Sequence, residues 1–469
     1  MDLLEIKNRE YVNISDIPNL TFAEFERNIL SENKRVISFF VEENILYAVI
    51  LDDENLKLYV YSTCVEKSYP SFTLKKPCMH MFEREIYENT GIEPIGHPFL
   101  KPVRKQKGYK FLQSDDFQSH EVAVGPVHAG IIEPGHFRFL CNGERVNHLE
   151  IMLGYQYRGI ETMIKNAPTV QLAESICGDS TIAYAKTFVE NIESLSSINV
   201  NTKSKLIRQI ALELERMAIH LGDLGAIAGD VAYQIGANVF GVTRTLVINT
   251  MLDICGNRFG KGLIKLGGVN YDITPQLIEK IDSMLEEVNS RAHIMKDAMF
   301  SNATVLSRLE NTGVVTKKRA KEIGLTGLMA RACGIKIDTR RFDYKDFEVK
   351  TLNTGDVYAR TYIRYLEIMQ SISLIKNLLK ELKEEETNHK KYKMNLQPNC
   401  FAISINEGWR GEIVHICMTD ENGYIKKYKI KDPSFNNWFG LALAVRNNQV
   451  SDFPVCNKSF NLSYCGFDL

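Results

Sequence analysis

The stretch LIRQIALELERMAIHLGDL, residues 206–224, decides the fold class because it has the pattern of one long amphipathic helix. It lies in a segment, residues 169–274, that contains no proline. An interior proline would cost a helix about 3 kcal/mol, so its absence favours long helices here. The apolar residues of the stretch recur at helical spacing, namely Ile207, Ile210, Leu214, Met217, Leu221 and Leu224.

Further long helices are expected after this stretch. Thr274 and Pro275 have the pattern of an N-cap residue followed by proline at the first helical position. A third long helix is expected near residues 362–382. Residues 401–430 then return to an alternation of apolar and polar side chains, which predicts strands. The second half of the chain therefore predicts a helical bundle with β-structure at its ends.

The first hundred residues have a different pattern. Residues 36–64 contain β-branched and aromatic runs broken by charged turns, which predicts a meander of strands. A polar connector then precedes a set of short strands and turns. The predicted fold class is α+β: a small α/β domain (residues 1–104), a linker (residues 105–122) and a helical bundle with peripheral β-structure (residues 123–469).

Composition and charge exclude several classes of function. The chain has 469 residues, of which 44% are hydrophobic and 25% charged, as in ordinary globular proteins. The formal net charge is −1 and the pI is about 6.8, so no basic field exists to hold nucleic acid. We therefore expect no nucleic-acid partner.

The cysteines and the N-terminus indicate a cytoplasmic protein. None of the ten cysteines forms a C-x-x-C pair, and their scatter is typical of reduced, buried thiols. The N-terminal sequence has no signal-peptide pattern, and no apolar run of about 18 residues predicts a membrane span. If the protein works at the inner face of the cell membrane, another subunit must hold it there.

The sequence predicts no cofactor bound by this chain alone. It has neither of the glycine-rich loops that bind dinucleotides or nucleotide phosphates. It also lacks a set of cysteines with the spacing of an iron–sulfur site. Any nicotinamide cofactor or iron–sulfur cluster is therefore expected in a neighbouring subunit.

Five motifs carry a resemblance to known families. FEREIYENTGIEPIGHPFLKPVR, residues 82–104, resembles the 30-kDa subunit of respiratory NADH:quinone oxidoreductase, complex I. GPVHAGIIEPGHFRF (125–139), LGYQYRGIE (153–161), GLTGLMARACG (324–334) and EGWRGE (407–412) resemble its 49-kDa subunit. They also resemble the large subunit of membrane-bound, energy-converting [NiFe] hydrogenases of the formate hydrogenlyase type. The resemblance implies a fused 30/49-kDa-type subunit with a hydrogenase-large-subunit-like bundle.

The resemblance implies that the nickel–iron centre is absent. In the hydrogenases, two C-x-x-C pairs supply four thiolates, which suit these soft metals. Here the first pair is Cys177 with Ser180, and the second falls on Ser463 and Gly466. Cys465 is close by but out of register. We therefore assign no metal ligand in this chain.

The resemblance also implies a set of pocket residues. In complex I, a histidine of the hairpin loop, an aspartate and a tyrosine serve a quinone headgroup. Here the loop has His128 and His136, the aspartate corresponds to Asp230, which we expect to be buried, and Cys177 lies where the tyrosine would be. Glu161 matches a hydrogenase glutamate that transfers protons. The candidate catalytic residues are His128, His136, Asp230, Glu161 and Cys177, and the candidate cofactor-binding residues are Arg138, His220 and Arg216.

Ordinary structural roles remain open for these residues. His128 and His136 can simply order a turn, and Cys177 can be a plain buried thiol. Arg216 and His220 belong to a polar stripe that also includes Glu213 and Asp223 at helical spacing. The stripe predicts either a hydrogen-bonded network between helices or a proton route. We further expect an ion pair between the arginine and the second glutamate of EGWRGE.

Three functions follow as hypotheses. The first is an electron-transfer subunit that passes electrons from a small, 20-kDa-like Fe–S subunit to a quinone-like or unknown acceptor. Membrane and antiporter-like subunits would then couple this step to ion translocation. The second is an active [NiFe] hydrogenase large subunit, and the third is a non-catalytic scaffold of such a complex. Two-electron reduction of a quinone needs proton donors at its oxygens, which is why the histidines matter.

Overall fold

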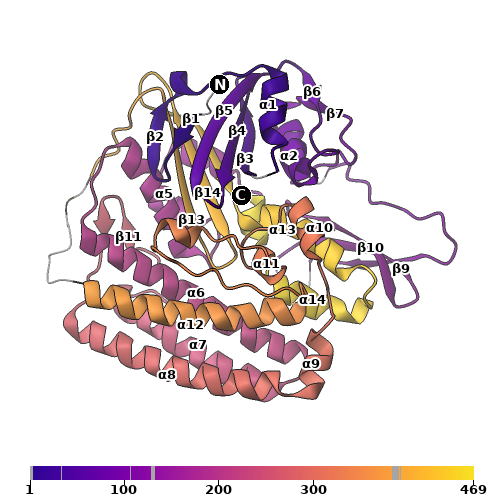
Figure 1. Cartoon of the computed structure of the whole chain (residues 1–469), viewed down its shortest axis with the longest axis vertical. Helices are drawn as coiled ribbons and strands as arrows, with labels where there is room; N and C mark the ends of the chain where they lie inside the picture. The colour runs from indigo at the N-terminus through magenta and orange to yellow at the C-terminus, as the bar shows by residue number, and fades with distance from the viewer. Residues whose placement is uncertain (1–3, 33, 106, 128–132, 383–389, 391) are drawn as a thin grey trace.

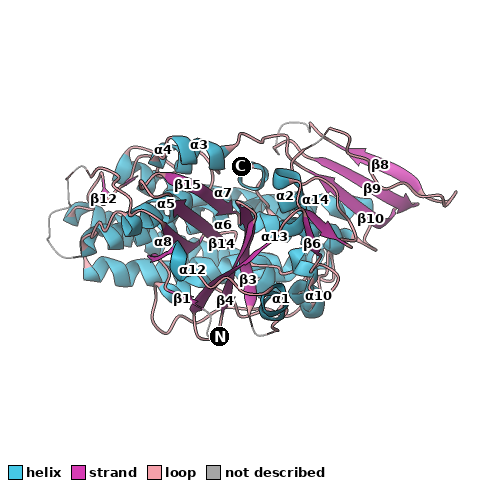
Figure 2. Ribbon diagram, turned by 90° about the horizontal axis from the view of Figure 1, so that it is seen from above, coloured by secondary structure: helices cyan, strands magenta, loops and turns pink. Residues whose placement is uncertain are grey.

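The computed structural model describes residues 4–32, 34–105, 107–127, 133–382, 390 and 392–469. Its mixture of helical bundle and sheets confirms the predicted α+β class. Figure 1 shows three parts: a bundle of long helices at the bottom, a central sheet above it, and the first hundred residues on top. A small three-stranded sheet projects at one end of the molecule (Figure 2).

Long antiparallel helices make the bundle, and they lie where the sequence predicts them. Helix α6 contains the stretch with helical apolar spacing, and α8 begins after the Thr274 side chain caps its first turn. Helices α6 and α12 lie side by side, as do α6 and α7 (Figure 1). The long helices are α5 (Thr181–Leu195), α6 (Thr202–Asp230), α7 (Gln234–Cys255), α8 (Pro275–Phe300) and α12 (Val357–Glu381).

The central sheet joins the two ends of the chain. Its strand order is β15-β14-β13-β2, all antiparallel, so a strand from the N-terminus completes a sheet formed near the C-terminus. Helix α5 packs on β13 and β14. The strands are β2 (Glu10–Asn13), β13 (Cys400–Glu407), β14 (Glu412–Thr419) and β15 (Ile425–Lys431).

The predicted N-terminal meander is confirmed as a second antiparallel sheet, of order β1-β5-β4-β3. Its strands are β1 (Leu4–Ile6), β3 (Arg35–Glu42), β4 (Ile45–Asp52) and β5 (Lys57–Cys64). This sheet packs on the central sheet through a shared apolar core, in which Tyr47 contacts Phe401. Helices α1 (Phe22–Ile29) and α2 (His80–Thr90) accompany it. The domain boundary at residue 104 stays a prediction.

The projecting sheet consists of β8 (His120–Val124), β9 (His136–Asn142) and β10 (Arg145–Met152). Among the described residues, two short strand pairs complete the β-structure: β6 (Ser68–Pro70) with β7 (Glu93–Ile95), and β11 (Ile264–Lys265) with β12 (Gly268–Val269). The remaining helices are α3 (Ile160–Asn166), α4 (Val170–Glu174), α9 (Ala303–Leu309), α10 (Lys317–Glu322), α11 (Gly327–Ala332), α13 (Pro433–Val445), α14 (Phe453–Phe460) and α15 (Tyr464–Asp468). Within the described part of the chain, no helix combines the length and hydrophobicity needed to span a bilayer.

Candidate functional site

The Cys177 thiol lies in the turn between α4 and α5, where two distant parts of the chain meet. Its side chain is buried, at 2% exposure. The thiol donates a hydrogen bond to Asp179 Oδ1 at 2.9 Å, and its sulfur lies 3.1 Å from Ser463 Oγ. Ser463 caps α15, where its hydroxyl accepts from the Gly466 N–H. The C-terminal segment therefore forms one wall of the Cys177 site.

Arg410 supplies the positive charge of this site. Its guanidinium donates to both carboxylate oxygens of Asp179, at 2.6 and 2.8 Å, and Nη1 lies 3.4 Å from the Cys177 sulfur. It also stacks on the neighbouring Trp409 ring, whose Nε1 donates to the Asp179 carbonyl. Both residues come from the tight turn between β13 and β14, so the motif EGWRGE brings them to the site.

The protonation states follow from these contacts. The pKa of Cys177 is raised well above its usual value by hydrogen bonding with Cys465, by burial and by the Asp179 charge. Burial would raise the pKa of Asp179 as well, but the Arg410 charge lowers it below its usual value. At neutral pH the site therefore holds a neutral thiol beside a carboxylate–guanidinium pair.

The residues at this site do not fit a nickel–iron centre. Two of the four positions that correspond to the hydrogenase thiolates are serines, and soft metals bind neutral hydroxyls poorly. At the fourth position, a Cβ added to Gly466 would lie 2.5 Å from Asp432 Oδ2 and 2.7 Å from Ser463 Oγ. Among the described residues, no group of three His, Cys, Asp or Glu side chains is placed to hold a metal ion. Cys177 is a protonated thiol at neutral pH, and the absence of a bound metal stays a prediction.

A chain of hydrogen bonds connects the site to the bundle. Arg410 Nε donates to the carbonyl of Asn461 at 2.6 Å, and the Asn461 side chain donates to Asp223 Oδ1 at 2.7 Å. Asp223 forms ion pairs with Arg364 at 2.8 Å and with Lys458 at 3.0 Å. We call Asp223, Arg364, Lys458 and Asn461 the Asp223 network. It reaches α6, α12 and α14.

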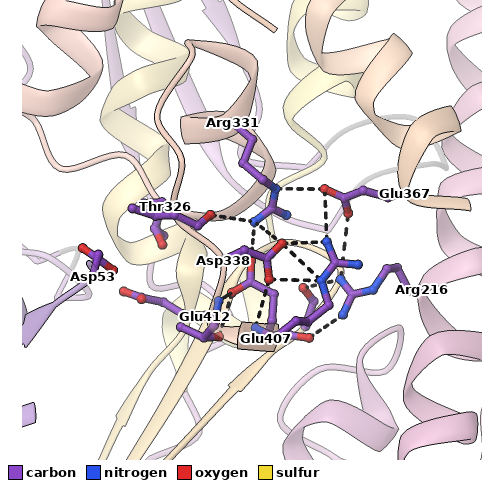
Figure 3. Close-up of polar contacts among 12 residues, drawn as sticks. Asp53, Arg216, Thr326, Arg331, Asp338, Glu367, Glu407 and Glu412 are labelled. Carbon is purple, nitrogen blue, oxygen red and sulfur yellow. Dashed lines mark hydrogen bonds and ion pairs between the residues drawn. The ribbon is translucent and has the colours of Figure 1, made fainter. Parts of the chain in front are cut away.

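Figure 3 shows a second network of buried charges. Glu367 accepts from His220 Nε2 at 3.0 Å and from Arg331 Nε at 2.9 Å. Arg331 also pairs with Glu407 and with Asp338, which binds Arg340. The His220 ring lies edge-on to Trp409, with centroids 6.3 Å apart. We call His220, Arg331, Asp338, Arg340, Glu367 and Glu407 the Glu367 network.

The polar stripe predicted on α6 is confirmed as a buried network. Arg216 pairs with Glu213 and donates to the carbonyls of Glu407 and Gly408. With His220, Arg216 therefore ties α6 to the turn that carries Arg410. These contacts bear out the hydrogen-bonded network, whereas the proton route and the cofactor-binding roles of both residues stay predictions.

Two groups near the site were not identified from the sequence. Glu215 on α6 is buried and accepts from the N–H groups of Ile182 and Ala183, in the first turn of α5. Burial raises the pKa of Glu215 to about 8, and the nearby Asp179 charge adds to the shift. The Tyr184 hydroxyl on α5 donates to Asp432. Glu215 lies in the helix that the periodicity predicts, and Tyr184 lies in the proline-free segment that favours helices, but nothing in the sequence indicates their partners.

The hairpin residues lie on the projecting sheet. His136 begins β9, and its ring contacts Phe111 with centroids 4.6 Å apart. Arg138 pairs with Glu121 of β8 at 2.6 Å. Just before β9, Glu133 accepts from the Cys465 N–H, so this end of the hairpin adjoins α15. His128 lies outside the described residues.

Two other candidates lie apart from Cys177. Glu161, in the first turn of α3, accepts from the backbone N–H of Ile430 at 2.8 Å and from Lys429 at 3.0 Å. Asp230 is exposed at the C-terminal end of α6, so the expectation that it is buried is wrong. The helix ends there, and its last residues reach the surface. The catalytic roles of both residues stay predictions.

The expected ion pair within EGWRGE is also wrong. Arg410 binds Asp179, whereas Glu412 binds Arg35 of β3 and Lys431 of β15. Arg410 lies in the turn itself, whereas Glu412 is the first residue of β14 and pairs with neighbouring strands. Glu412 thereby connects the N-terminal sheet to the central sheet.

A separate cavity of about 460 Å³ lies on the other side of Trp438, which lines it and donates to the Ser463 carbonyl. Its lining is mostly apolar and comes from α2, the segment that follows it, β10 and α13. The residues that line it include His80, His97, His148 and Arg446 but not Cys177 or His136. This cavity is therefore not the pocket that the sequence predicted.

Comparisons with known proteins agree with the motifs. A family model described as "Respiratory-chain NADH dehydrogenase, 49 Kd subunit" matches residues 234–405. The alpha subunit of the membrane-bound hydrogenase of Pyrococcus furiosus is 29% identical over 365 residues, which cover 73% of this chain and 85% of that protein. A subunit of the NADH-quinone oxidoreductase of Clostridium beijerinckii is 28% identical over 324 residues, with 67% and 87% covered.

Two further matches extend the comparison. Formate hydrogenlyase subunit 5 of Escherichia coli is 25% identical over 434 residues, which cover 84% of this chain and 76% of that protein. A chain in the structure of the membrane-bound sulfane sulfur reductase, an archaeal respiratory membrane complex, superposes with a TM-score of 0.70 at 22% identity. That match covers 76% of this chain and all of the other, and it shows a shared fold. The predicted family resemblance is confirmed.

Proposed function

We propose that this chain, a relative of the 49-kDa subunit of respiratory NADH dehydrogenase and of membrane-bound hydrogenase subunits, transfers electrons within a membrane-associated oxidoreductase complex. Electrons arrive from an Fe–S cluster in a small adjacent subunit and leave to an acceptor at the Cys177 site. Membrane subunits, antiporter-like among them, use the resulting charge change to move ions. The chain acts only within that complex, on the inner face of the membrane.

One observation carries the proposal: buried charge networks begin at the site where the hydrogenases hold their metal. The Asp223 network starts from Arg410, and the Glu367 network contacts Trp409 through His220. Charges interact more strongly in a protein interior than in water, so a new charge at Cys177 shifts the proton affinity of these groups. Such a shift is a physical means of coupling electron transfer to ion movement.

The donor set argues against an active [NiFe] hydrogenase. Of the four positions that correspond to thiolates, only Cys177 keeps its sulfur, and that thiol is protonated and hydrogen-bonded to Asp179. An active [NiFe] hydrogenase would contain one nickel per complex, and the residues at this site do not supply the thiolates to bind it.

The test uses the intact complex, purified with its partner subunits. We expect less than stoichiometric nickel, and electron flux that falls at least tenfold in Asp223→Asn. The matched control is Asp282→Asn, an exposed aspartate on α8, which leaves flux unchanged. One nickel per complex would establish the hydrogenase instead. Equal flux in both variants would establish a scaffold without a coupling role.

A further inference from the structure

Two thiols share one hydroxyl at the C-terminal wall of the site. Ser463 Oγ lies 3.1 Å from the Cys177 sulfur and 3.6 Å from the Cys465 sulfur. We propose that Cys177 and Cys465 form a redox-active dithiol that reduces the sulfur–sulfur bond of small organic disulfides. Cys465 is out of register with the hydrogenase motif in the sequence, yet the fold brings it to Cys177.

The backbone segments that carry the two cysteines are fastened together. Arg158 donates to the carbonyls of Ser175 and Ile176, at 2.7 and 2.9 Å, on the Cys177 side. The same guanidinium donates to the Cys465 carbonyl at 3.4 Å. Disulfide formation requires two sulfurs that can approach without large backbone movement. Arg158 and Ser463 hold the two segments in that arrangement.

The exposure of the two thiols differs, which gives them different roles. Cys465 is half-buried on the five-residue helix α15, whereas Cys177 is almost fully buried. A substrate therefore meets Cys465 first. Cys177 is the resolving thiol, in the manner of thiol–disulfide exchange through a mixed disulfide.

The exchange balances in atoms and electrons. The Cys465 thiolate attacks RS–SR, a Cys465–S–S–R bond forms, and RS⁻ leaves and takes a proton. The Cys177 thiolate then attacks the Cys465 sulfur, the Cys177–Cys465 disulfide forms, and a second RS⁻ leaves and takes a proton. One substrate disulfide is reduced to two thiols, and the protein dithiol is oxidised by two electrons with the loss of two protons.

Charged groups beside Cys177 suit its role in the second step. Asp179 Oδ1 accepts the thiol hydrogen bond at 2.9 Å and orients the thiol, whose proton passes to the leaving RS⁻. Arg410 Nη1, 3.4 Å from the sulfur, stabilises the thiolate that attacks. Return of the protein disulfide to the dithiol needs two electrons and two protons. For this return alone the inference rests on the proposed function, because the electrons come from the Fe–S cluster of the adjacent subunit.

The first arm of the test treats the anaerobically purified complex with 2-hydroxyethyl disulfide, blocks free thiols with N-ethylmaleimide and identifies peptides by mass spectrometry. We expect a Cys177–Cys465 cross-linked peptide and two equivalents of 2-mercaptoethanol. Cys177→Ser stops at a mixed disulfide on Cys465, and Cys465→Ser gives neither product. Cys64→Ser, which removes an exposed thiol bonded to Asn19, leaves the cross-link unchanged.

Two outcomes overturn the dithiol. In the first, Cys177 and Cys465 of the wild-type complex enter no disulfide and stay open to alkylation by maleimide, while Cys64 reacts with the added disulfide. In the second, Cys465 stops at the mixed disulfide although Cys177 is intact. The second arm supplies electrons to the oxidised wild-type complex through its physiological donor and follows loss of the cross-link. Loss of the cross-link supports both proposals. A cross-link that forms but survives this reduction overturns the electron route of the proposed function and leaves the dithiol standing.

Discussion

Arg410 and Asp179 form a two-pronged ion pair, with Nη1–Oδ1 at 2.6 Å and Nη2–Oδ2 at 2.8 Å. The pair spans the turn before α5 and the turn before β14, so it fixes two segments that the chain places far apart. It also sets the surroundings of the Cys177 thiol, which touches both partners. The geometry of this pair therefore controls the site.

Arg410→Lys tests that control. Lysine keeps the charge but cannot form the planar two-pronged contact, and it loses the bond to the Asn461 carbonyl. We expect the free energy of unfolding to fall by about 1–3 kcal/mol, with loss of Cys177-dependent electron transfer. Chemical denaturation measures the first effect. Arg319→Lys, in an exposed pair with Glu322, is the control and should change stability by less than about 0.5 kcal/mol. Equal losses of stability in both variants would refute a special role for the Arg410–Asp179 pair.

Removing the charge of Glu367 should lower the free energy of unfolding more than Arg410→Lys does. Burial raises the pKa of Glu367, but Arg331 and Arg340 outweigh it and hold this pKa well below the usual value, so the group is a carboxylate. Glu367→Gln removes a negative charge that neutralises Arg331 and Arg340, and both arginine side chains are buried. We expect a loss of about 3–5 kcal/mol in the free energy of unfolding, measured by denaturation at neutral pH.

Glu286→Gln provides the comparison for that variant, because Glu286 is largely exposed and pairs with Lys376 at the surface. Exposed pairs contribute about 0–1 kcal/mol, so its loss should be small. A Glu367→Gln protein as stable as Glu286→Gln would mean that the buried charges compensate one another without Glu367.

The sequence predicts the elements of this fold well and their long-range partners poorly. Helical spacing in residues 206–224 and the Thr274–Pro275 cap predict α6 and α8 because these signals are local. The pairing of β2 with β13 has no local signal, since it joins residues close to opposite ends of the chain.

The same distinction applies to the site. The motif EGWRGE identifies the turn that carries Arg410, and the missing cysteines predict that no nickel–iron centre is bound, which stays a prediction. The choice of Asp179 rather than Glu412 as the partner of Arg410 depends on tertiary geometry. Asp230 shows the opposite error: apolar neighbours in the sequence suggested burial, but the end of α6 reaches the surface. Cys465 shows that a residue out of register with a motif can still reach the site.

Asp223 predicts a specific dependence of stability on pH. Burial favours its neutral form, but Lys458 and Arg364 prevail and lower its pKa from 3.8 to about 2. The folded pKa lies below the unfolded one, so Asp223 adds stability above pH 3.8 that is lost as the pH falls toward 2. We expect this contribution to be about 2 kcal/mol. In denaturation series from pH 7 to pH 3, Asp223→Asn should show a shallower acid loss than the wild type, whereas Asp282→Asn should follow the wild type.

Glu215 should make the stability depend on pH in the opposite direction to Asp223. Burial raises its pKa from 4.5 to about 8, so the folded protein binds the proton more tightly than the unfolded chain does. Its contribution is therefore fully present below pH 4.5 and is lost as the pH rises toward 8. Glu215→Gln keeps a side-chain oxygen for the backbone N–H groups of α5 and removes the titration. Relative to the wild type, the variant should gain up to about 1.4 kcal/mol per pH unit between pH 5 and pH 7.

Urea denaturation of both proteins at half-unit pH intervals measures this gain, with Glu279→Gln, an exposed glutamate on α8, as the control whose difference from the wild type stays constant. Because Glu215 lies near Asp179, a proton held there at neutral pH is available to the Cys177 site. Electron flux in the intact complex should therefore lose its pH dependence between pH 7 and pH 9 in Glu215→Gln. Parallel stability curves for wild type and variant would show that Glu215 is already ionised at pH 5, and the proton would have to come from another group.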